Sequence, residues 1–75
     1  MREVVRTNDM VLISAVEALF TGAEIGHLLA DAHVSALEGS IGILPRRILV
    51  IDEDLARARR LLTEAGLGEV LYDGP

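Results

Sequence analysis

Cysteine and lysine are both missing from this chain of 75 residues. Without cysteine the chain forms no disulfide, no thiolate metal site and no cysteine nucleophile, and nothing in it points to a secreted disulfide scaffold. Without lysine, Schiff-base and lysine-nucleophile chemistry is excluded. The absence of cysteine favours a protein of a reducing compartment.

Long apolar runs and positive charge are also scarce. No stretch approaches the roughly 18 apolar residues of a membrane span, and the first residues lack the apolar core and cleavage site of a signal peptide. We therefore expect a cytoplasmic protein with no membrane partner. The net charge is −5 and the isoelectric point is near 4.8. A chain with this net charge offers no broad positive surface to neutralise the phosphates of a nucleic acid, so we expect no nucleic-acid partner.

The length allows one domain, residues 1–75, and excludes a second core. A chain this short buries only about 60% of the surface that its unfolded form exposes. Domains below about 80 residues usually need a disulfide, a metal, a partner or very regular packing for stability. The missing cysteines remove the first of these options.

The first half of the chain predicts a strand, a helix and a second strand. Residues 2–7 place valines among charged residues, which is typical of a short strand. Thr7 or Asn8 then caps a helix that Gly22 ends. At about 100° per residue, one arc of this helix is apolar; it contains Leu12, Ile13, Ala15, Val16, Leu19 and Phe20. Residues 24–33 predict the second strand.

The second half repeats this order after an irregular connection, residues 32–45, which is rich in glycine, serine and isolated aliphatic residues. Residues 47–51 form a continuous apolar run, typical of a central strand buried on both faces. An acidic cap then starts a helix that ends at Gly66; the cap is Asp52, Glu53 and Asp54. Residues 67–75 supply a short edge strand, at 70–72, and a tail.

The order strand, helix, strand, strand, helix, strand predicts an α+β fold of the ferredoxin-like βαββαβ kind. Its antiparallel sheet carries both helices on one face and leaves the other face open. Alternation along the central strand lines that open face with either Ile48 and Val50 or Leu49 and Ile51. Both pairs are apolar, so we expect a cover. A second subunit is favoured over residues 34–44 folding back, and the expected assembly is a homo-oligomer.

Asp31 and His33 are the first candidate site. Two residues apart on a strand, they share a face, with Cβ atoms about 6.6 Å apart, and could hold one metal ion. Two ligands do not complete a metal site, so Glu38 or a neighbouring subunit would have to contribute. A solvated polar strand end explains the pair more simply, and we expect neither a metal nor a cofactor.

The second candidate is an anion site in residues 38–47. Two glycines around a serine let backbone amides converge on an anion, and the arginine pair that follows can fork onto phosphate or carboxylate oxygens. The spacing matches no phosphate-binding motif, and tight turns with solvated arginines are the simpler explanation. Together, the candidate ligand-binding residues are Asp31, His33, Glu38, Gly39, Ser40, Gly42, Arg46 and Arg47.

Several of these residues carry a resemblance to a known family. The segments are Val-Val-Arg-Thr-Asn-Asp at 4–9, Asp31-x-His33, Glu-Gly-Ser-Ile-Gly at 38–42 and Pro-Arg-Arg-Ile-Leu-Val at 45–50. They resemble the bacterial family labelled putative prokaryotic signal-transducing protein, over residues 2–66. The chain departs from the family pattern at Met10, where proline is frequent, which bears on helix capping more than on function.

The resemblance implies a ferredoxin-like domain grouped by fold with the PII (GlnB-like) nitrogen regulators, and a regulatory or ligand-sensing role. The nucleotide-binding residues of PII proteins have no match in this sequence, so none is assigned here. The position of residues 31–47 corresponds to the connection at which that superfamily tends to bind ligands and partners.

Three functions follow as hypotheses. The first is a non-enzymatic regulatory module whose residues 31–47 bind a protein partner or a small anionic ligand. The second is a metal-dependent or acid/base enzyme centred on Asp31, His33 and Glu38. The third is a structural adaptor that pairs with another protein through its open sheet face or an edge strand.

Overall fold

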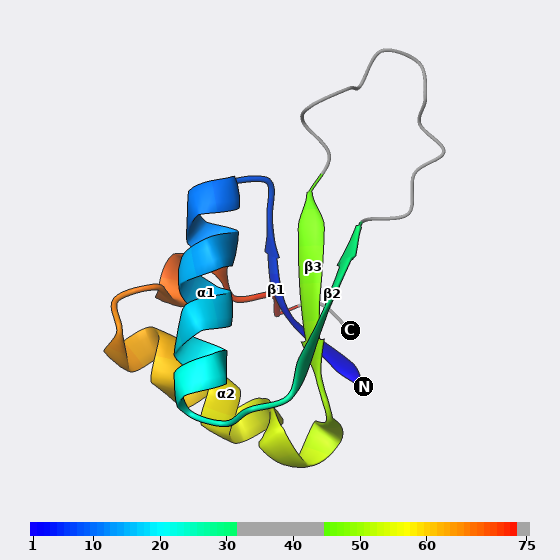
Figure 1. The fold of residues 1–75 in the computed structure, drawn as a ribbon, viewed down its shortest axis with the longest axis vertical. Helices are drawn as coiled ribbons and strands as arrows, with labels where there is room; N and C mark the ends of the chain where they lie inside the picture. Colours follow the sequence, from blue (N-terminus) through cyan, green and yellow to red (C-terminus); the bar gives the residue numbers. More distant parts are fainter. Residues whose placement is uncertain (32–44, 74–75) are drawn as a thin grey trace.

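The computed structural model describes residues 1–31 and 45–73 (Figure 1). Three strands, two α-helices and two single-turn 3₁₀ helices make up this part of the chain. In chain order they are β1 (Arg2–Thr7), α1 (Met10–Gly22), β2 (His27–Asp31), β3 (Arg46–Val50), η1 (Asp52–Asp54), α2 (Leu55–Glu64) and η2 (Gly68–Val70).

The strands form one antiparallel sheet in the order β1-β3-β2. Both helices lie on the same side of this sheet (Figure 1). This arrangement confirms the α+β class and is compatible with the ferredoxin-like βαββαβ order. β3 is the central strand, as predicted, although it runs one residue earlier than the predicted span of 47–51.

A β-bulge interrupts the pairing of β1 with β3. Glu3 lies opposite Leu49 and Val5 lies opposite Ile48, so Val4 is the extra residue. A bulge sets two residues of one strand against one residue of its partner. Val4 and Val5 are consequently both fully buried, although neighbouring residues of a regular strand would face opposite sides of the sheet.

One hydrophobic core fills the space between the sheet and the helices. Its buried members from the helices are Ile13, Val16, Phe20, Ala58 and Leu62, and those from the sheet are Val4, Val5, Ile48 and Val50. Ile48 and Val50 therefore face the helices, which leaves Leu49 on the open side. Alternation places Ile51 on the open side as well, and its side chain is 47% exposed.

The N-terminal end of α1 differs from the prediction. Asp9, rather than Thr7 or Asn8, is the N-cap, because its Oδ1 accepts hydrogen bonds from the amides of Val11 (2.9 Å) and Leu12 (3.3 Å). Gly22 is the last residue of the helix, as predicted, but Ala23 is the C-cap and Gly22 does not take the left-handed conformation of the turn.

The turn after α1 is a Schellman motif. The Ile25 amide donates to Phe20 O over 2.8 Å and the Glu24 amide donates to Thr21 O over 3.1 Å. Glu24 takes the left-handed conformation that this turn requires, with φ 59°. Residues 24 and 25 are therefore part of the turn, and β2 begins at His27 rather than at residue 24.

α2 ends in the same motif, and here the prediction is confirmed. The Leu67 amide donates to Leu62 O over 2.8 Å and the Gly66 amide donates to Thr63 O over 3.1 Å. Gly66 takes the left-handed conformation with φ 81°. At the other end of α2, the three acidic residues form η1 in advance of the helix.

The chain after α2 returns to the free edge of β1. Leu71 forms one antiparallel bridge with Val5, and the Tyr72 amide donates to Val4 O over 3.0 Å. Where the sequence predicts a short strand at 70–72, the structure has a 3₁₀ turn followed by this single bridge. Its place beside β1 is the place that the last strand occupies in the βαββαβ order.

Within residues 1–31 and 45–73, neither α-helix has the length and apolar character needed to cross a lipid bilayer.

Candidate functional site

The structure describes three of the predicted ligand-binding residues: Asp31, Arg46 and Arg47. Asp31 lies opposite Arg46 in the β2–β3 pairing, and Thr7 of β1 lies opposite Arg46 on the other side. Residues 31–47 therefore begin and end at the same corner of the sheet. The remaining candidates lie outside the described residues and stay predictions; they are His33, Glu38, Gly39, Ser40 and Gly42.

Arg47 belongs to the open face of the sheet as well as to that corner. In the strand register it lies opposite Arg6 of β1 and Ala30 of β2. Leu49, two residues on, lies opposite Glu3 and Leu28. Since residues directly opposite each other share a face, the register defines the open face. Its strand residues are Glu3, Arg6, Leu28, Ala30, Arg47 and Leu49.

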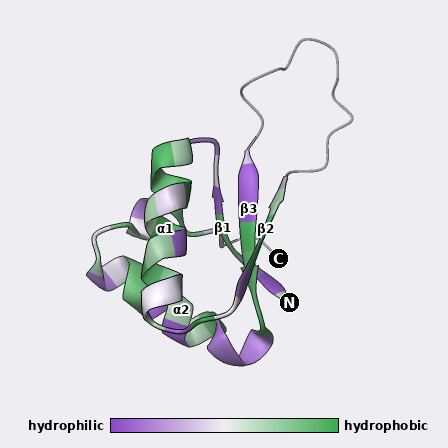
Figure 2. Cartoon of the chain, in the orientation of Figure 1, coloured by the Kyte–Doolittle hydropathy of each residue, from purple (hydrophilic) through white to green (hydrophobic). Residues whose placement is uncertain are grey.

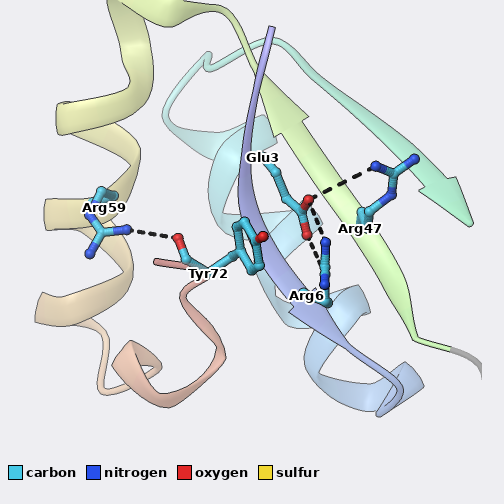
Figure 3. Close-up of polar contacts among 5 residues, drawn as sticks. All are labelled: Glu3, Arg6, Arg47, Arg59 and Tyr72. Carbon is cyan, nitrogen blue, oxygen red and sulfur yellow. Dashed lines mark hydrogen bonds and ion pairs between the residues drawn. The ribbon is translucent and has the colours of Figure 1, made fainter. Parts of the chain in front are cut away.

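A charged cluster occupies the β1–β3 side of this face (Figure 3). Arg6 forms a bidentate pair with Glu3, with Nε donating to Oε2 over 2.6 Å and Nη2 donating to Oε1 over 3.0 Å. Arg47 approaches the same carboxylate, with Nη1 3.9 Å from Oε1. Glu3 keeps only 12% of its side chain exposed. We call Glu3, Arg6, Arg47 and Tyr72 the Glu3 cluster.

Tyr72 completes the cluster from the C-terminal segment. The Arg6 guanidinium lies over its ring, 4.2 Å from the ring centroid, which is a cation–π geometry. Hydrogen bonding to Glu3, followed by the charges of Glu3 and Tyr72, raises the pKa of Arg6 above its ordinary value. Arg6 therefore stays charged at every pH at which the protein would be handled.

Arg59 of α2 holds the tyrosine in place from the other side. Its Nη1 donates to the backbone carbonyl of Tyr72 over 3.2 Å, and its Nη2 pairs with Asp73 over 2.6 Å. The two interactions connect α2 to the segment that carries Tyr72; Figure 3 shows the first of them. The open face is thus held by contacts from β1, β3 and the C-terminal segment together.

The β2 side of the open face is apolar. Leu28 is 53% exposed and Leu49 is half-buried, and Ile51 continues the apolar surface beyond the end of β3. Figure 2 shows the change along β3 itself, which is hydrophilic near residues 46 and 47 and hydrophobic farther along. The face therefore offers a charged region beside an apolar one, which suits a partner that carries both.

The contacts of His27 indicate a structural role. This residue lies on the edge strand β2, with its ring edge-on to Phe20 at a centroid distance of 5.5 Å. Its Nδ1 lies 3.1 Å from Ile25 O, and its Nε2 lies 3.8 Å from the Glu17 carboxylate. These contacts connect the start of β2 to α1.

Among residues 1–31 and 45–73, no group of three or more histidine, aspartate or glutamate side chains is arranged to hold a metal ion. None of the core residues described is polar or charged. The enzyme hypothesis depends on His33 and Glu38, which lie outside the described part of the chain, so the structure does not test it.

The Glu3 cluster is the feature that the sequence did not predict. Glu3 and Arg6 are three residues apart, a spacing that puts side chains on opposite faces of a regular strand. The bulge at Val4 adds one residue and returns Arg6 to the face of Glu3. The available signal was the pair of adjacent valines between two charged residues, because that order breaks strand alternation.

Comparison with protein families gives one match of broad extent. A family model described as putative prokaryotic signal transducing protein matches residues 1–66. The match includes the sheet, both helices and three members of the Glu3 cluster, while Tyr72 lies beyond it. Comparison with curated proteins gives no match.

Proposed function

Because the chain belongs to the family described as putative prokaryotic signal transducing protein, we propose that it is a non-enzymatic regulatory module. Residues 31–47 form its binding surface, together with the part of the open face that adjoins them. The bound molecule is a small anionic ligand or the acidic group of a protein partner.

The position of Arg47 is the observation that best supports this proposal. It ends the segment that the sequence marks as an anion site, and its guanidinium also lies beside the Glu3 carboxylate on the open face. A ligand bound by residues 31–47 would therefore meet the Glu3 cluster. Binding at the corner could in this way reach the sheet and the C-terminal segment that carries Tyr72.

The Glu3 cluster supports an anionic ligand by its chemistry. Two guanidinium groups converge on one carboxylate, and one of the pairs is bidentate. Planar, forked donors of this kind suit carboxylate and phosphate oxygens. An incoming anion would compete with Glu3 for Arg47, whose contact of 3.9 Å is longer than the two Arg6 contacts to the same carboxylate.

A second candidate function is a structural adaptor that pairs with another protein through the open face. The exposure of Leu28 and Ile51 favours it, because apolar side chains beside a charged region are typical of protein-binding surfaces. Under this hypothesis no small ligand is needed, and substitutions at Leu28 or Ile51 weaken partner binding more than substitutions at the arginines do.

An amide NMR titration of the full, isotopically labelled chain tests the first proposal. The panel contains nucleotides, 2-oxo acids, inorganic phosphate and divalent metal ions. We expect one anionic compound to shift the amides of residues 31–47 and of Glu3 and Arg6, with saturation below about 1 mM. The double variant Arg46→Gln/Arg47→Gln should lose these shifts.

The matched control is Arg2→Gln/Arg60→Gln, which removes the same charge from two exposed arginines outside the corner. Shifts that persist in the first variant, or that vanish in the control, would contradict the assignment to Arg46 and Arg47. Shifts produced by a metal ion and centred on residues 31–38 would instead favour the enzyme hypothesis. If no compound moves any amide, the small-ligand proposal is wrong and the adaptor remains.

A further inference from the structure

The two edges of the sheet are protected to different degrees. The outer edge of β1 receives the C-terminal segment, through the Leu71 bridge to Val5 and the Tyr72 amide on Val4 O. β1 also carries the bulge and three charged residues, Arg2, Glu3 and Arg6. Bulges, charges and covering segments are the devices that keep edge strands from pairing with other chains.

β2 is the other edge strand and has few of these devices. It pairs with β3 in an uninterrupted register from His27 to Asp31, and no described residue pairs with its outer edge. Its sequence, His-Leu-Leu-Ala-Asp, contains no proline, lysine or arginine. Leu28 is 53% exposed on the open face beside this edge. An edge of this kind is a template for another strand.

We propose that the strand that pairs with this edge is β2 of a second copy of the chain. The two β2 strands run antiparallel about a two-fold axis through Leu29 and join the two sheets into one continuous sheet. An isologous contact of this kind closes on itself, so the product is a dimer and not a fibre. The inference rests on β2 alone and is independent of the proposed ligand-binding function.

The register follows from the geometry of an antiparallel pair. A two-fold axis that relates neighbouring antiparallel strands stands perpendicular to the sheet. The open faces of the two copies therefore lie on the same side of the joined sheet. Residues directly opposite each other must share a face, which means that the axis passes through a residue and not between two residues. Within β2, the possible centres are Leu28, Leu29 and Ala30.

Only the centre at Leu29 pairs every apolar residue of β2 with an apolar residue and the acidic residue with the histidine. It sets Leu29 opposite Leu29, Leu28 opposite Ala30 and His27 opposite Asp31 of the second copy. The last pair places an acidic residue beside a histidine, the one basic residue type in the strand.

The other two centres give poorer pairs. A centre at Leu28 sets His27 opposite Leu29 and brings Gly26 into the pairing. A centre at Ala30 sets Leu29 opposite Asp31, which places an aliphatic residue against an acid. Cross-strand pairs of matched character stabilise a sheet, and mismatched pairs do not.

Disulfide trapping tests the register. Because the chain has no native cysteine, every disulfide must join the introduced residues. Leu28→Cys and Ala30→Cys are purified separately and then oxidised alone and as a mixture. In the proposed dimer, residues 28 and 30 of opposite chains lie about 4.5–5.5 Å apart at Cα, whereas two copies of residue 28 are offset along the strands beyond the roughly 7 Å that a disulfide spans. We therefore expect covalent dimer in the mixture and little in either variant alone.

Each other trapping result overturns the proposal. Efficient self-crosslinking of Leu28→Cys would place the axis at Leu28, and efficient self-crosslinking of Ala30→Cys would place it at Ala30. No crosslinking in any sample would show that these strands do not meet.

Sedimentation of the full chain measures the association itself. We expect a concentration-dependent species of twice the monomer mass. The variant Leu28→Lys/Ala30→Lys sets like charges directly opposite each other at two symmetric places, and it should raise the dissociation constant by about tenfold or more. The matched control, Val11→Lys/Ala18→Lys, adds the same two charges on the exposed side of α1, where Val11 is 76% exposed, and should leave the constant unchanged.

Circular dichroism confirms that both variants are folded before they are compared. A chain that stays monomeric at millimolar concentration overturns the proposal. So does a dimer that both lysine variants weaken equally, since the contact would then not depend on β2.

Discussion

The two Schellman turns allow a stability prediction in which the structure fixes the sign. Both turns place one residue in the left-handed conformation, Glu24 at φ 59° after α1 and Gly66 at φ 81° after α2. This conformation costs a residue with a Cβ roughly 1–2 kcal/mol, whereas glycine adopts it without that strain. Glu24 therefore holds a position that glycine would occupy with less strain, and Gly66 already does so.

We expect Glu24→Gly to raise the free energy of unfolding by about 0.5–1 kcal/mol. The gain is smaller than the strain removed, because glycine also increases the entropy of the unfolded chain. Gly66→Ala should lower the free energy by about 1 kcal/mol. A Cβ at Gly66 would meet no atom within 4 Å, so this loss comes from the backbone conformation and not from a clash.

Urea and thermal unfolding followed by far-ultraviolet circular dichroism measure both changes. For a domain of this size, about 1 kcal/mol corresponds to a shift of roughly 4–8 °C in Tm. Gly22→Ala is the matched control, since Gly22 is the last residue of α1 and a Cβ there also meets no atom within 4 Å. Its Tm should rise because alanine favours helix. A fall in Tm for Glu24→Gly would refute the reasoning, because it would mean that Glu24 contributes more through its side chain than its backbone costs.

Three further predictions concern the cap, the faces of β3 and the Glu3 cluster. Asp9→Ala should cost about 1 kcal/mol in urea unfolding, because the amides of the first turn of α1 lose their acceptor; an unchanged midpoint would contradict the cap. Ile48→Val should cost about 0.5–1.5 kcal/mol, and Ile51→Val less than about 0.5 kcal/mol, since only Ile48 is in the core; equal costs would contradict the assignment of the faces. Glu3→Gln should destabilise the chain equally at pH 7 and about pH 10. The pKa of Arg6 is raised above its ordinary value, so the contribution of Arg6 is complete at every pH below the ordinary arginine pKa and is lost only above it; a difference that shrinks by pH 10 would contradict this sign.

Much of the fold could be predicted because the relevant signals are local. Residues 2–7 and the apolar run of β3 are strands in the structure. Gly66 ends α2 as predicted, since a glycine after a helical stripe is the usual residue for a left-handed turn. The fold class followed from the order of these elements, without any contact being known.

The left-handed turn after α1 could not be placed by the same rule, although the last helical residue, Gly22, was predicted. Gly22 is the glycine nearest the end of the apolar arc, but the turn forms at Glu24, two residues later. The structure shows the reason: this position lets Ile25 follow the turn into the core beside Phe20, with 2% and 0% of their surfaces exposed. Burial of an isoleucine outweighs about 1–2 kcal/mol of backbone strain. Tertiary packing therefore set this boundary against the local preference.

The choice of open face needed the structure, whereas the presence of an open face did not. Alternation left two possible pairs for that face, and nothing in the sequence of β3 separates them. Arg47 shares its face with Leu49, but Arg46 shares its face with Ile48 and Val50, so each face of β3 carries one arginine.

The Glu3 cluster shows why the candidate site was harder to predict than the fold. A single extra residue in β1 has two effects at once. It buries both Val4 and Val5, and it turns Arg6 toward Glu3 and Arg47 on the open face. If one valine were absent, the strand would alternate regularly, and Glu3 and Arg6 would be two residues apart on one face without any bulge. The charged cluster is compatible with either strand, but only the bulged strand also supplies a second valine to the core. In a domain this small, where each buried aliphatic side chain contributes about 1.5–3 kcal/mol, that second valine is a physical reason for the irregularity that the sequence pattern alone does not reveal.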